Sequence, residues 1–280
     1  MIPKIIHKTG PFNNINSLPE CLKDIFNHNK KLNKNYSFRY YNDADATTII
    51  KYFDKDVYEA YNSIIPKAFK MDIFRMVILY LYGGIYSDLS QKFNVSLSKI
   101  INHDKDKLII CQNMEICFMA SYPKNELFKF ILDYQINNIK NRDYGECKTD
   151  ITGPVAVRKA FNIYFNKNIK NDIKLGNYDD NINVLLKIKY MDNIFNKLID
   201  SIRREKRYKM YLVDINNKRL IKMYCRNHKK LLYNETHIPH YGELYNKRRV
   251  FIDGNPDFKK LFILILSVGL FIVSCIIKNT

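Results

Sequence analysis

The sequence predicts an α/β fold with a mostly parallel sheet, and three observations support that prediction. Short apolar runs of strand length alternate with longer amphipathic stretches through the N-terminal half of the chain, which is the order of elements in α/β proteins. A long apolar helix pattern stops at Gly83-Gly84 and a strand pattern follows it directly. The composition, with 46% hydrophobic and 26% charged residues, is that of a globular chain long enough to bury a core.

The first elements alternate between strand and helix. Ile2 to His7 is a short apolar run that predicts a buried strand, and Pro19 to Leu32 carries its apolar residues on one side, which predicts a helix. Ser37 to Tyr41 is aromatic and predicts a second strand. Asp43 is a candidate cap for a helix that runs to about Phe53.

The next elements repeat this alternation. Pro66 opens a strong helix pattern that ends at the glycine pair, and Ile85 to Leu89 follows as a strand. Weaker patterns predict two more strands and a helix, at Leu108 to Cys111, Phe118 to Ala120 and Glu126 to Ile139. Residues 162–196 are rich in Asn, Lys and Ile, and their pattern supports no assignment.

The charge balance leaves two interpretations open. Lysine and arginine number 46 against 28 acidic residues, a net charge of +18. Such a charge favours an anionic partner, either a nucleic acid, a phosphate-bearing substrate or a membrane face. A coding bias toward Lys, Asn, Ile and Tyr would give the same charge. The six cysteines show neither C-x-x-C spacing nor a disulfide framework, which predicts free thiols in a reducing compartment.

The C-terminal segment predicts a membrane anchor at 259–280, behind a catalytic domain at 1–258. Leu261 to Ile277 is 17 residues long without a charge, and as a helix it would span roughly 26 Å, close to the thickness of a bilayer core. Basic residues cluster before the segment and only Lys278 follows it, so the large N-terminal part is expected in the cytosol. A buried core helix is the alternative interpretation.

The segment from Ala68 to Ser90 carries the strongest functional signal. Asp72 and Arg75 lie three residues apart on one helix face, among neighbours that are apolar nearly all round. A buried ion pair contributes little to stability, so its presence suggests a binding site; a purely structural pair is the alternative. The strand after the glycines delivers Asp88 to its carboxyl end, where open α/β sheets bind ligands.

Five segments in order resemble glycosyltransferase family 32 and, more distantly, the sugar-binding core of the clostridial glucosylating toxins. They are I-P-K-I-I-H-K-T at the start, K-K-L-N-K-N-Y-S-F-R-Y-Y-N-D-A-D-A, the M-D-x-x-R helix, Y-G-G-I-Y-S-D-L-S and I-T-G-P. The resemblance covers about residues 1–160. No single segment is specific, but their common order is.

The resemblance implies a GT-A fold, a nucleotide-sugar donor, a divalent cation such as Mn²⁺ or Mg²⁺, and transfer that retains the anomeric configuration. It implies that Asp72 and Arg75 hold the donor sugar and phosphate. Asp88, the first carboxylate of the D-x-D motif, is expected to bind ribose and the metal-bound diphosphate beside Tyr86. These three charged residues are the candidate catalytic residues. The opening segment is expected to contact the base through His7, Thr9 and Phe12.

The sequence departs from the family pattern at two positions. Ser90 replaces the second D-x-D carboxylate, and since hard cations prefer carboxylate oxygens, metal binding should be weaker unless another ligand compensates. Gly10 replaces a Trp, and the chain has no Trp at all; Phe12 is the candidate stacking face in its place.

A compensating ligand is offered by T-H-I-P-H-Y-G-E-L-Y at 236–245. His240 and Glu243 both carry suitable donor atoms, and the resemblance places an element of this kind over the diphosphate. A loop with solvated histidines is the alternative interpretation.

The sequence therefore favours a retaining glycosyltransferase that moves a hexose from GDP-mannose or a UDP-sugar to a glycan or glycolipid acceptor at a membrane. The alternative is a catalytically weakened nucleotide-sugar-binding or membrane scaffold protein. A nucleic-acid partner is not expected, because the basic residues are scattered rather than grouped with aromatic residues.

Overall fold

The computed structural model describes residues 1–112, 114–168, 176–179, 182–190, 210–224, 230–232, 235 and 238–252, and gives the backbone alone for 176–179 and 182–190. The predicted anchor at 259–280 and the boundary before it lie outside the described residues. Among the helices of the described ranges, none combines the length and the apolar character that a membrane span requires.

The helices of the described residues are α1 (Glu20–Leu32), α2 (Asp43–Phe53), α3 (Lys55–Ser63), α4 (Lys67–Tyr82), α5 (Glu126–Lys140), α6 (Pro154–Tyr164) and α9 (Tyr241–Asn246). The strands are β1 (Ile5–Thr9), β2 (Ser37–Tyr41), β3 (Gly84–Ser87), β4 (Lys92–Phe93), β5 (Leu108–Cys111), β6 (Phe118–Ser121), β7 (Gly176–Asp179), β8 (Ile182–Tyr190), β9 (Met210–Val213) and β10 (Arg219–Lys222). Strands and helices alternate, as predicted, only from β1 to α2; α3 and α4 then follow α2 directly, and β3 to β6 follow with no α-helix among the described residues between them.

The described strands form one sheet in the order β2-β1-β3-β6-β5-β8-β9-β10-β4, with β7 paired to β8. The prediction of an α/β class is confirmed, but the sheet is mixed rather than mostly parallel. β1 runs parallel to β2 and β3, and β5 parallel to β8. The other pairs are antiparallel. The cause is visible at β5 and β6, which six residues join as a hairpin without a crossover helix.

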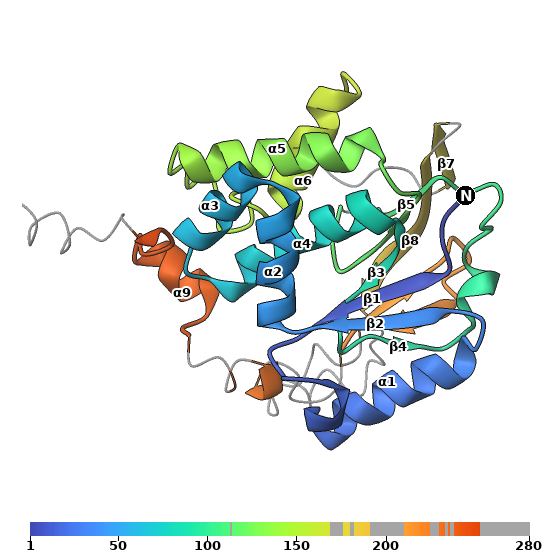
Figure 1. The fold of residues 1–280 in the computed structure, drawn as a ribbon. Coiled ribbons are helices and arrows are strands. Elements are labelled where there is room, and N and C mark those ends of the chain that lie inside the picture. The colour runs from blue at the N-terminus through green and yellow to red at the C-terminus, as the bar shows by residue number, and fades with distance from the viewer. Residues whose placement is uncertain are drawn as a thin grey trace, which may run out of the picture.

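The helices divide between the two faces of the sheet. Helices α2 to α6 gather on one side and α1 lies on the other (Figure 1). The largest apolar core lies on the first side and includes most of α4, whose residues from Ile73 to Leu79 are all buried. A second core packs Ile6 of β1 and Ile85 of β3 against β10. The sheet is therefore covered on both faces, as its apolar strands require.

Two local predictions need correction. The cap of α2 is Asn42 rather than Asp43. The Asn42 side-chain oxygen accepts a hydrogen bond of 2.8 Å from the Asp45 N–H, and the Asp45 carboxylate accepts one from the Asn42 N–H. An Asn at this position satisfies a free helix N–H as well as Asp does. The first strand runs from Ile5 to Thr9, since pairing with β2 starts only at Ile5.

The glycine pair links α4 to β3 as predicted. Gly83 and Gly84 have φ of +61° and +87°, a region that residues with a Cβ rarely occupy. A Cβ on Gly84 would lie 2.6 Å from the Ile5 main-chain oxygen of the neighbouring strand. The glycines thus allow the chain to reverse directly from α4 into the sheet, which brings the residues after β3 back beside α4.

Candidate functional site

Helix α4 buries the predicted ion pair. The Arg75 Nη2 lies 3.2 Å from Asp72 Oδ1, and the two side chains are 9% and 12% exposed. Their spacing of three residues places them on one helix face, and the apolar residues around them hold that face inside the protein. The Asp72 Oδ2 also accepts a hydrogen bond of 3.0 Å from the Thr152 hydroxyl.

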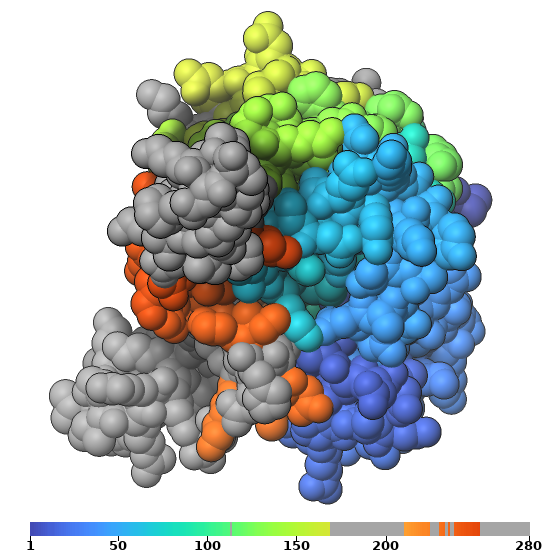
Figure 2. All heavy atoms as spheres, turned by 60° about the vertical axis from the view of Figure 1, so that its left-hand side comes forward, coloured from blue at the N-terminus to red at the C-terminus, as the bar shows by residue number. Residues whose placement is uncertain are grey.

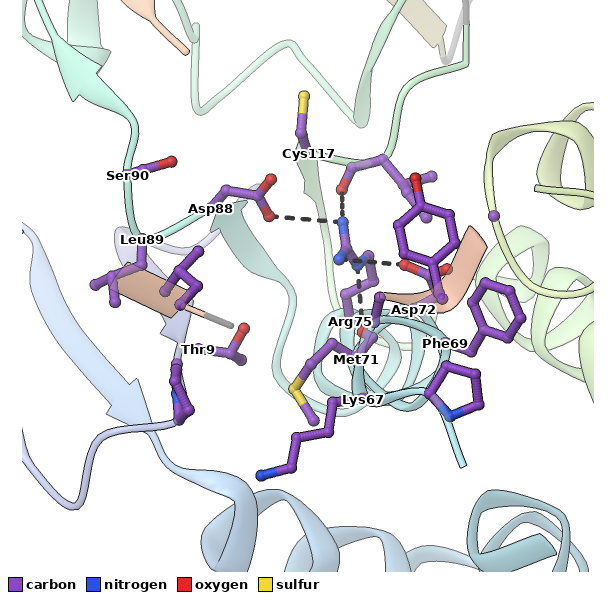
Figure 3. A pocket seen from close by; sticks show the side chains of 18 of the residues that line it. Thr9, Lys67, Phe69, Met71, Asp72, Arg75, Asp88, Leu89, Ser90 and Cys117 are labelled. Atoms are coloured by element: carbon purple, nitrogen blue, oxygen red, sulfur yellow. Dashed lines mark hydrogen bonds and ion pairs between the residues drawn. The ribbon is translucent and has the colours of Figure 1, made fainter. Parts of the chain in front are cut away.

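Arg75 is the centre of the site. Its Nη1 donates to the Ile116 main-chain oxygen, and its Nε donates to the Met71 oxygen at 3.2 Å. The guanidinium lies over the Tyr86 ring, 4.6 Å from its centroid. Asp72 and Asp88 approach the guanidinium from different sides (Figure 3). A cation held by this many contacts is fixed in position before any ligand arrives.

Asp88 follows the last residue of β3 directly, as predicted for the carboxyl end of a strand. Its N–H donates to the Cys117 oxygen at 3.0 Å, which fixes the backbone. Its carboxylate lies 3.7 Å from Arg75 Nη1, and the side chain is 32% exposed, far more than that of Asp72. Asp88 is therefore the carboxylate of the pair that has room for a ligand.

Two opposing effects set the pKa values of Asp72 and Asp88: burial of the two carboxyl groups, and the positive charge of Arg75 that both of them face. Burial raises the pKa of Asp72 to about 7, although Arg75 and the Thr152 hydroxyl oppose the rise. Burial also raises the pKa of Asp88, opposed by Arg75 and Lys8. Burial works to lower the pKa of Arg75, but the acidic groups around it raise that pKa above its usual value. Arg75 is therefore positively charged throughout the working range of pH.

These residues line one cavity of about 530 Å³. Of the predicted donor-binding residues, the structure brings together Thr9, Asp72, Arg75, Tyr86, Asp88 and Ser90. Segments distant in sequence complete the walls, among them the start of α4, the start of α6 and residues 238–241. The start of α4 and the segment around α9 lie on the same face of the molecule (Figure 2). The volume suits a small-molecule ligand.

Two predicted donor-binding residues are not brought to this cavity. His7 is fully buried, and its ring nitrogens lie 3.0 Å from the Tyr41 hydroxyl and 2.9 Å from the Gly83 oxygen. Burial lowers the pKa of His7 to about 4, so the ring is neutral. Phe12 is 4% exposed and packs with Leu18 and neighbouring apolar residues under α1. Both side chains therefore belong to the packed interior of the protein and not to the wall of the cavity.

Of the two candidate metal ligands in residues 236–245, His240 lies at the cavity and Glu243 does not. His240 lines the cavity, stacks on Tyr241 at 4.2 Å between centroids, and accepts from the Gly242 N–H. Glu243 is exposed and pairs with Lys247 at 2.7 Å, away from the cavity wall. Within the described part of the chain, no three His, Cys, Asp or Glu side chains approach closely enough to hold a metal ion by themselves.

Ser90 lies in the cavity wall, but its hydroxyl forms a hydrogen bond to another part of the protein. The side chain donates to the Met223 oxygen at 3.2 Å, and the residue is 3% exposed. The hydroxyl hydrogen is therefore used inside the protein, while the oxygen keeps acceptor capacity.

Sequence reasoning missed three contributors to the site. Thr152 belongs to the I-T-G-P segment, whose position in the order of motifs was the available signal. Glu115 lines the cavity, and burial raises its pKa, with Asp88 adding to the rise. Lys8 is fully buried behind Asp88. Lys8 belongs to the opening I-P-K-I-I-H-K-T segment and Glu115 to no motif, and the sequence did not indicate a role for either because their contacts join segments that are distant in sequence.

Comparison with known families addresses the identity of this site. Residues 19–107 match the model of a family described as a glycosyltransferase sugar-binding region containing a DXD motif. The matched segment contains Asp72, Arg75, Asp88 and Ser90, and the prediction of a glycosyltransferase is confirmed. A nucleotide-sugar donor and a separate acceptor are the partners that such an enzyme implies.

Comparison with curated protein sequences gives no significant match. Among solved structures, this glycosyltransferase is similar to one titled PaToxG glycosyltransferase, with 15% identity over 59% of this chain and 70% of that one, and a TM-score of 0.47. It is also similar to the ligand-free glycosyltransferase domain of the YGT toxin, with 10% identity, coverage of 60% and 69%, and a TM-score of 0.37.

Proposed function

We propose that the protein is a retaining glycosyltransferase with a GT-A type domain, which transfers a hexose from a nucleotide-sugar donor to a glycan or glycolipid acceptor. The observation that carries this proposal is Asp88. Its partly exposed carboxylate leaves the end of β3, faces the fixed guanidinium of Arg75 at 3.7 Å, and opens into the cavity of about 530 Å³.

Arg75 would stabilise the departing nucleoside diphosphate. Negative charge grows on that group as the bond to the anomeric carbon breaks, and fixed donors aimed at growing charge are the main catalytic contribution in such reactions. The contacts of Arg75 with Met71 and Ile116 hold it in place, so little reorganisation is needed as the charge develops. Losing one such donor typically costs about 2.7–4 kcal/mol in the barrier.

Asp72 would orient the hexose. Its carboxylate is anchored on two sides, by Arg75 and by the Thr152 hydroxyl, and it still lines the cavity. A carboxylate with spare lone pairs accepts hydrogen bonds from sugar hydroxyls. Retention follows if the acceptor attacks from the face that the diphosphate leaves, and that route needs no protein nucleophile.

The residues present fit a divalent cation held jointly with the donor. Mg²⁺ is usually bound through one or two carboxylates together with substrate phosphates and water, and Asp88 supplies one accessible carboxylate. The Ser90 oxygen and His240 lie in the same cavity wall. Bound Mn²⁺ or Mg²⁺ would supply further positive charge to the leaving diphosphate.

The proposed donors follow from the resemblance to glycosyltransferase family 32, and the proposed acceptors follow from the predicted membrane anchor. GDP-mannose and UDP-sugars are the donors proposed. A cytosolic catalytic domain anchored by residues 259–280 would act on acceptors close to a membrane, which favours glycolipids and membrane-near glycans.

A donor screen tests the proposed function. The full-length protein in detergent is mixed with a panel of GDP- and UDP-sugars, with and without Mn²⁺, and the release of GDP or UDP is measured. We expect release from at least one donor and its loss in Asp88→Asn. Asp24→Asn, an exposed position on α1, is the matched control and should keep the activity. Release that survives Asp88→Asn would contradict the assignment.

The alternative of a nucleotide-sugar binder without turnover rests on Ser90, whose hydroxyl is committed to Met223. It would be favoured if the protein binds nucleoside diphosphates in an Asp88-dependent way and releases none from any donor.

A further inference from the structure

A fully buried lysine lies directly behind the turn that carries Asp88. Lys8, in the middle of β1, has no exposed surface, and its Nζ lies 5.2 Å from the centroid of the Phe93 ring. An ammonium group is costly to remove from water unless it finds strong partners. Its partners here are polar atoms of Ser87 and Asp88, so residues next to the site stabilise the buried ammonium group.

The contacts of Lys8 fix the shape of the turn. Its Nζ donates to the Asp88 main-chain oxygen at 3.1 Å and to the Ser87 hydroxyl oxygen at 3.1 Å. The same Asp88 oxygen accepts the Gln91 N–H at 3.0 Å, which closes the turn from 88 to 91. The Ser87 hydroxyl donates to Gln91 Oε1 at 2.8 Å. Lys8 therefore holds the start of the turn directly, and it is linked to Gln91 through the Ser87 hydroxyl and the Asp88 oxygen.

The network extends to α1 on the far side of the sheet. The Asn29 side-chain amide donates to the Gln91 oxygen at 2.8 Å and its carbonyl accepts from the Phe93 N–H at 2.8 Å. Hydrogen bonds between buried polar groups restrict the segments that they join, although the Gln91 Nε2 has no hydrogen-bond partner among the described residues. The turn that presents Asp88 and Ser90 to the cavity thus rests on a fixed base.

In its protonated form Lys8 also places a positive charge next to Asp88. Burial lowers the pKa of Lys8 to about 7, and the charge of Asp88 opposes this fall. The charge of Lys8 and that of Arg75 both oppose the effect of burial on the pKa of Asp88. Because Ser90 replaces the second carboxylate of the motif, Asp88 is the only carboxylate that the turn from 88 to 91 presents to a cation or a diphosphate.

We propose that Lys8 is the positioning residue of the Asp88 site: it fixes the turn from 88 to 91 and directs the Asp88 carboxylate into the cavity. The functional consequence of this inference rests on the proposed function. It is that Lys8 raises the affinity of the protein for the donor diphosphate without contacting the diphosphate.

A double-mutant cycle tests the proposal on the full-length protein. Lys8→Met removes the ammonium and keeps an unbranched chain, and it is made in the wild-type and the Asp88→Asn backgrounds. The dissociation constants of UDP and GDP with Mn²⁺ are measured by calorimetry. Partners that orient a ligating side chain typically change affinity by about 10- to 100-fold, so we expect that loss in the wild-type background. In the Asp88→Asn background we expect a change of about twofold or less, because coupled residues are not additive.

A merely structural role would give a different pattern. Lys8→Met would then lower the melting temperature and weaken binding by the same factor in both backgrounds, which would overturn the proposal. Lys30→Met, on the exposed side of α1, is the control and should leave binding unchanged. If Lys8→Met does not fold, Lys8→Gln, which keeps a hydrogen-bond donor but no charge, is judged in the same cycle by the same criterion.

Hydrogen exchange separates this inference from the proposed function. The Gln91 N–H is hydrogen-bonded to the Asp88 oxygen inside the turn, and the Asp88 N–H is hydrogen-bonded to the Cys117 oxygen beside it, so faster exchange at both in the folded Lys8 variant supports the positioning role. Unchanged exchange overturns it. A wild-type protein that binds neither UDP nor GDP contradicts the proposed function alone, and exchange at these two N–H groups then decides the role of Lys8.

Discussion

Replacing Arg75 with Met tests the electrostatic arrangement of the site. The guanidinium lies 3.2 Å from Asp72 Oδ1 and 3.7 Å from Asp88 Oδ1, so the substitution removes a positive partner that both carboxylates share. Asp72 bears most of the consequence because its side chain is only 12% exposed. Removing one partner of a buried ion pair typically costs about 3–5 kcal/mol, and we expect a loss of that size in the free energy of unfolding near pH 8.

The cost should depend on pH in a defined direction. Burial raises the pKa of Asp72 to about 7 even with Arg75 present, and without Arg75 it rises further. A carboxyl with a higher pKa in the folded state takes up a proton on folding. The penalty of its charge is absent below the unfolded pKa of 3.8, grows as the pH rises from there to the folded pKa, and is constant above the folded pKa. Because Arg75→Met raises the folded pKa, the penalty continues to grow to a higher pH in the variant than in the wild type. The loss caused by Arg75→Met should therefore shrink between about pH 8 and about pH 5.

Urea unfolding followed by circular dichroism measures both effects. The double variant Arg75→Met with Asp72→Asn removes the unpaired charge and should recover a large part of the lost stability, since a neutral replacement of a buried pair is often tolerated. Lys129→Met, which breaks an exposed pair with Asp133, is the control and should cost about 1 kcal/mol or less. A loss below about 1 kcal/mol at pH 8 for Arg75→Met, or one equal at both pH values, would refute the reasoning.

Three further predictions concern the frame of the site. Burial lowers the pKa of His7 from 6.5 to about 4, so stability contributed by the neutral ring should be lost as the pH falls through this window, by up to about 3 kcal/mol. His7→Gln should remove this part of the pH dependence and His28→Gln, on the exposed side of α1, should keep it, as measured by unfolding at a series of pH values. Thr152→Val removes the hydroxyl that donates to Asp72 at 3.0 Å and should cost about 1–3 kcal/mol in urea unfolding; an unchanged midpoint would show that this bond contributes nothing. Gly84→Ala puts a Cβ 2.6 Å from a main-chain oxygen at a φ of +87° and should lower stability by about 1–3 kcal/mol or more, so a melting temperature equal to that of the wild type would contradict the structure at this turn.

Local patterns predicted the elements that position Asp72, Arg75 and Asp88. The apolar periodicity of α4, its stop at the glycine pair and the strand that follows are properties of neighbouring residues, so they can be read without knowing the fold. The spacing of Asp72 and Arg75 on one helix face follows from the same local geometry.

The opening strand shows where such reasoning stops. Successive residues of a strand point to opposite faces, so Lys8 lies on one face and His7 and Thr9 share the other, yet even these two differ in role. Thr9 reaches the cavity and bonds the Tyr86 hydroxyl at 3.0 Å. His7 is enclosed between β2 and the glycine pair. Which residues a strand buries depends on its neighbours in the sheet, and those neighbours are distant in sequence.

The mixed sheet and the additional wall residues have the same cause. The hairpin of β5 and β6 places Ile116 and Glu115 beside α4, although neither residue belongs to a recognisable motif. Pairing of this kind is fixed by long-range packing rather than by local preference. The order of motifs therefore located the site, while the pairing of the strands determined most of its detailed contacts.

The most direct test of the central claim is a crystal structure of the full-length protein with a nucleoside diphosphate and Mn²⁺. The account predicts that the diphosphate lies in the cavity of about 530 Å³, in contact with Asp88 directly or through the cation, and within reach of Arg75. A diphosphate bound elsewhere, for instance in the cavity between Met1 and His103, with the Asp88 side chain unchanged and still paired with Arg75, would contradict it.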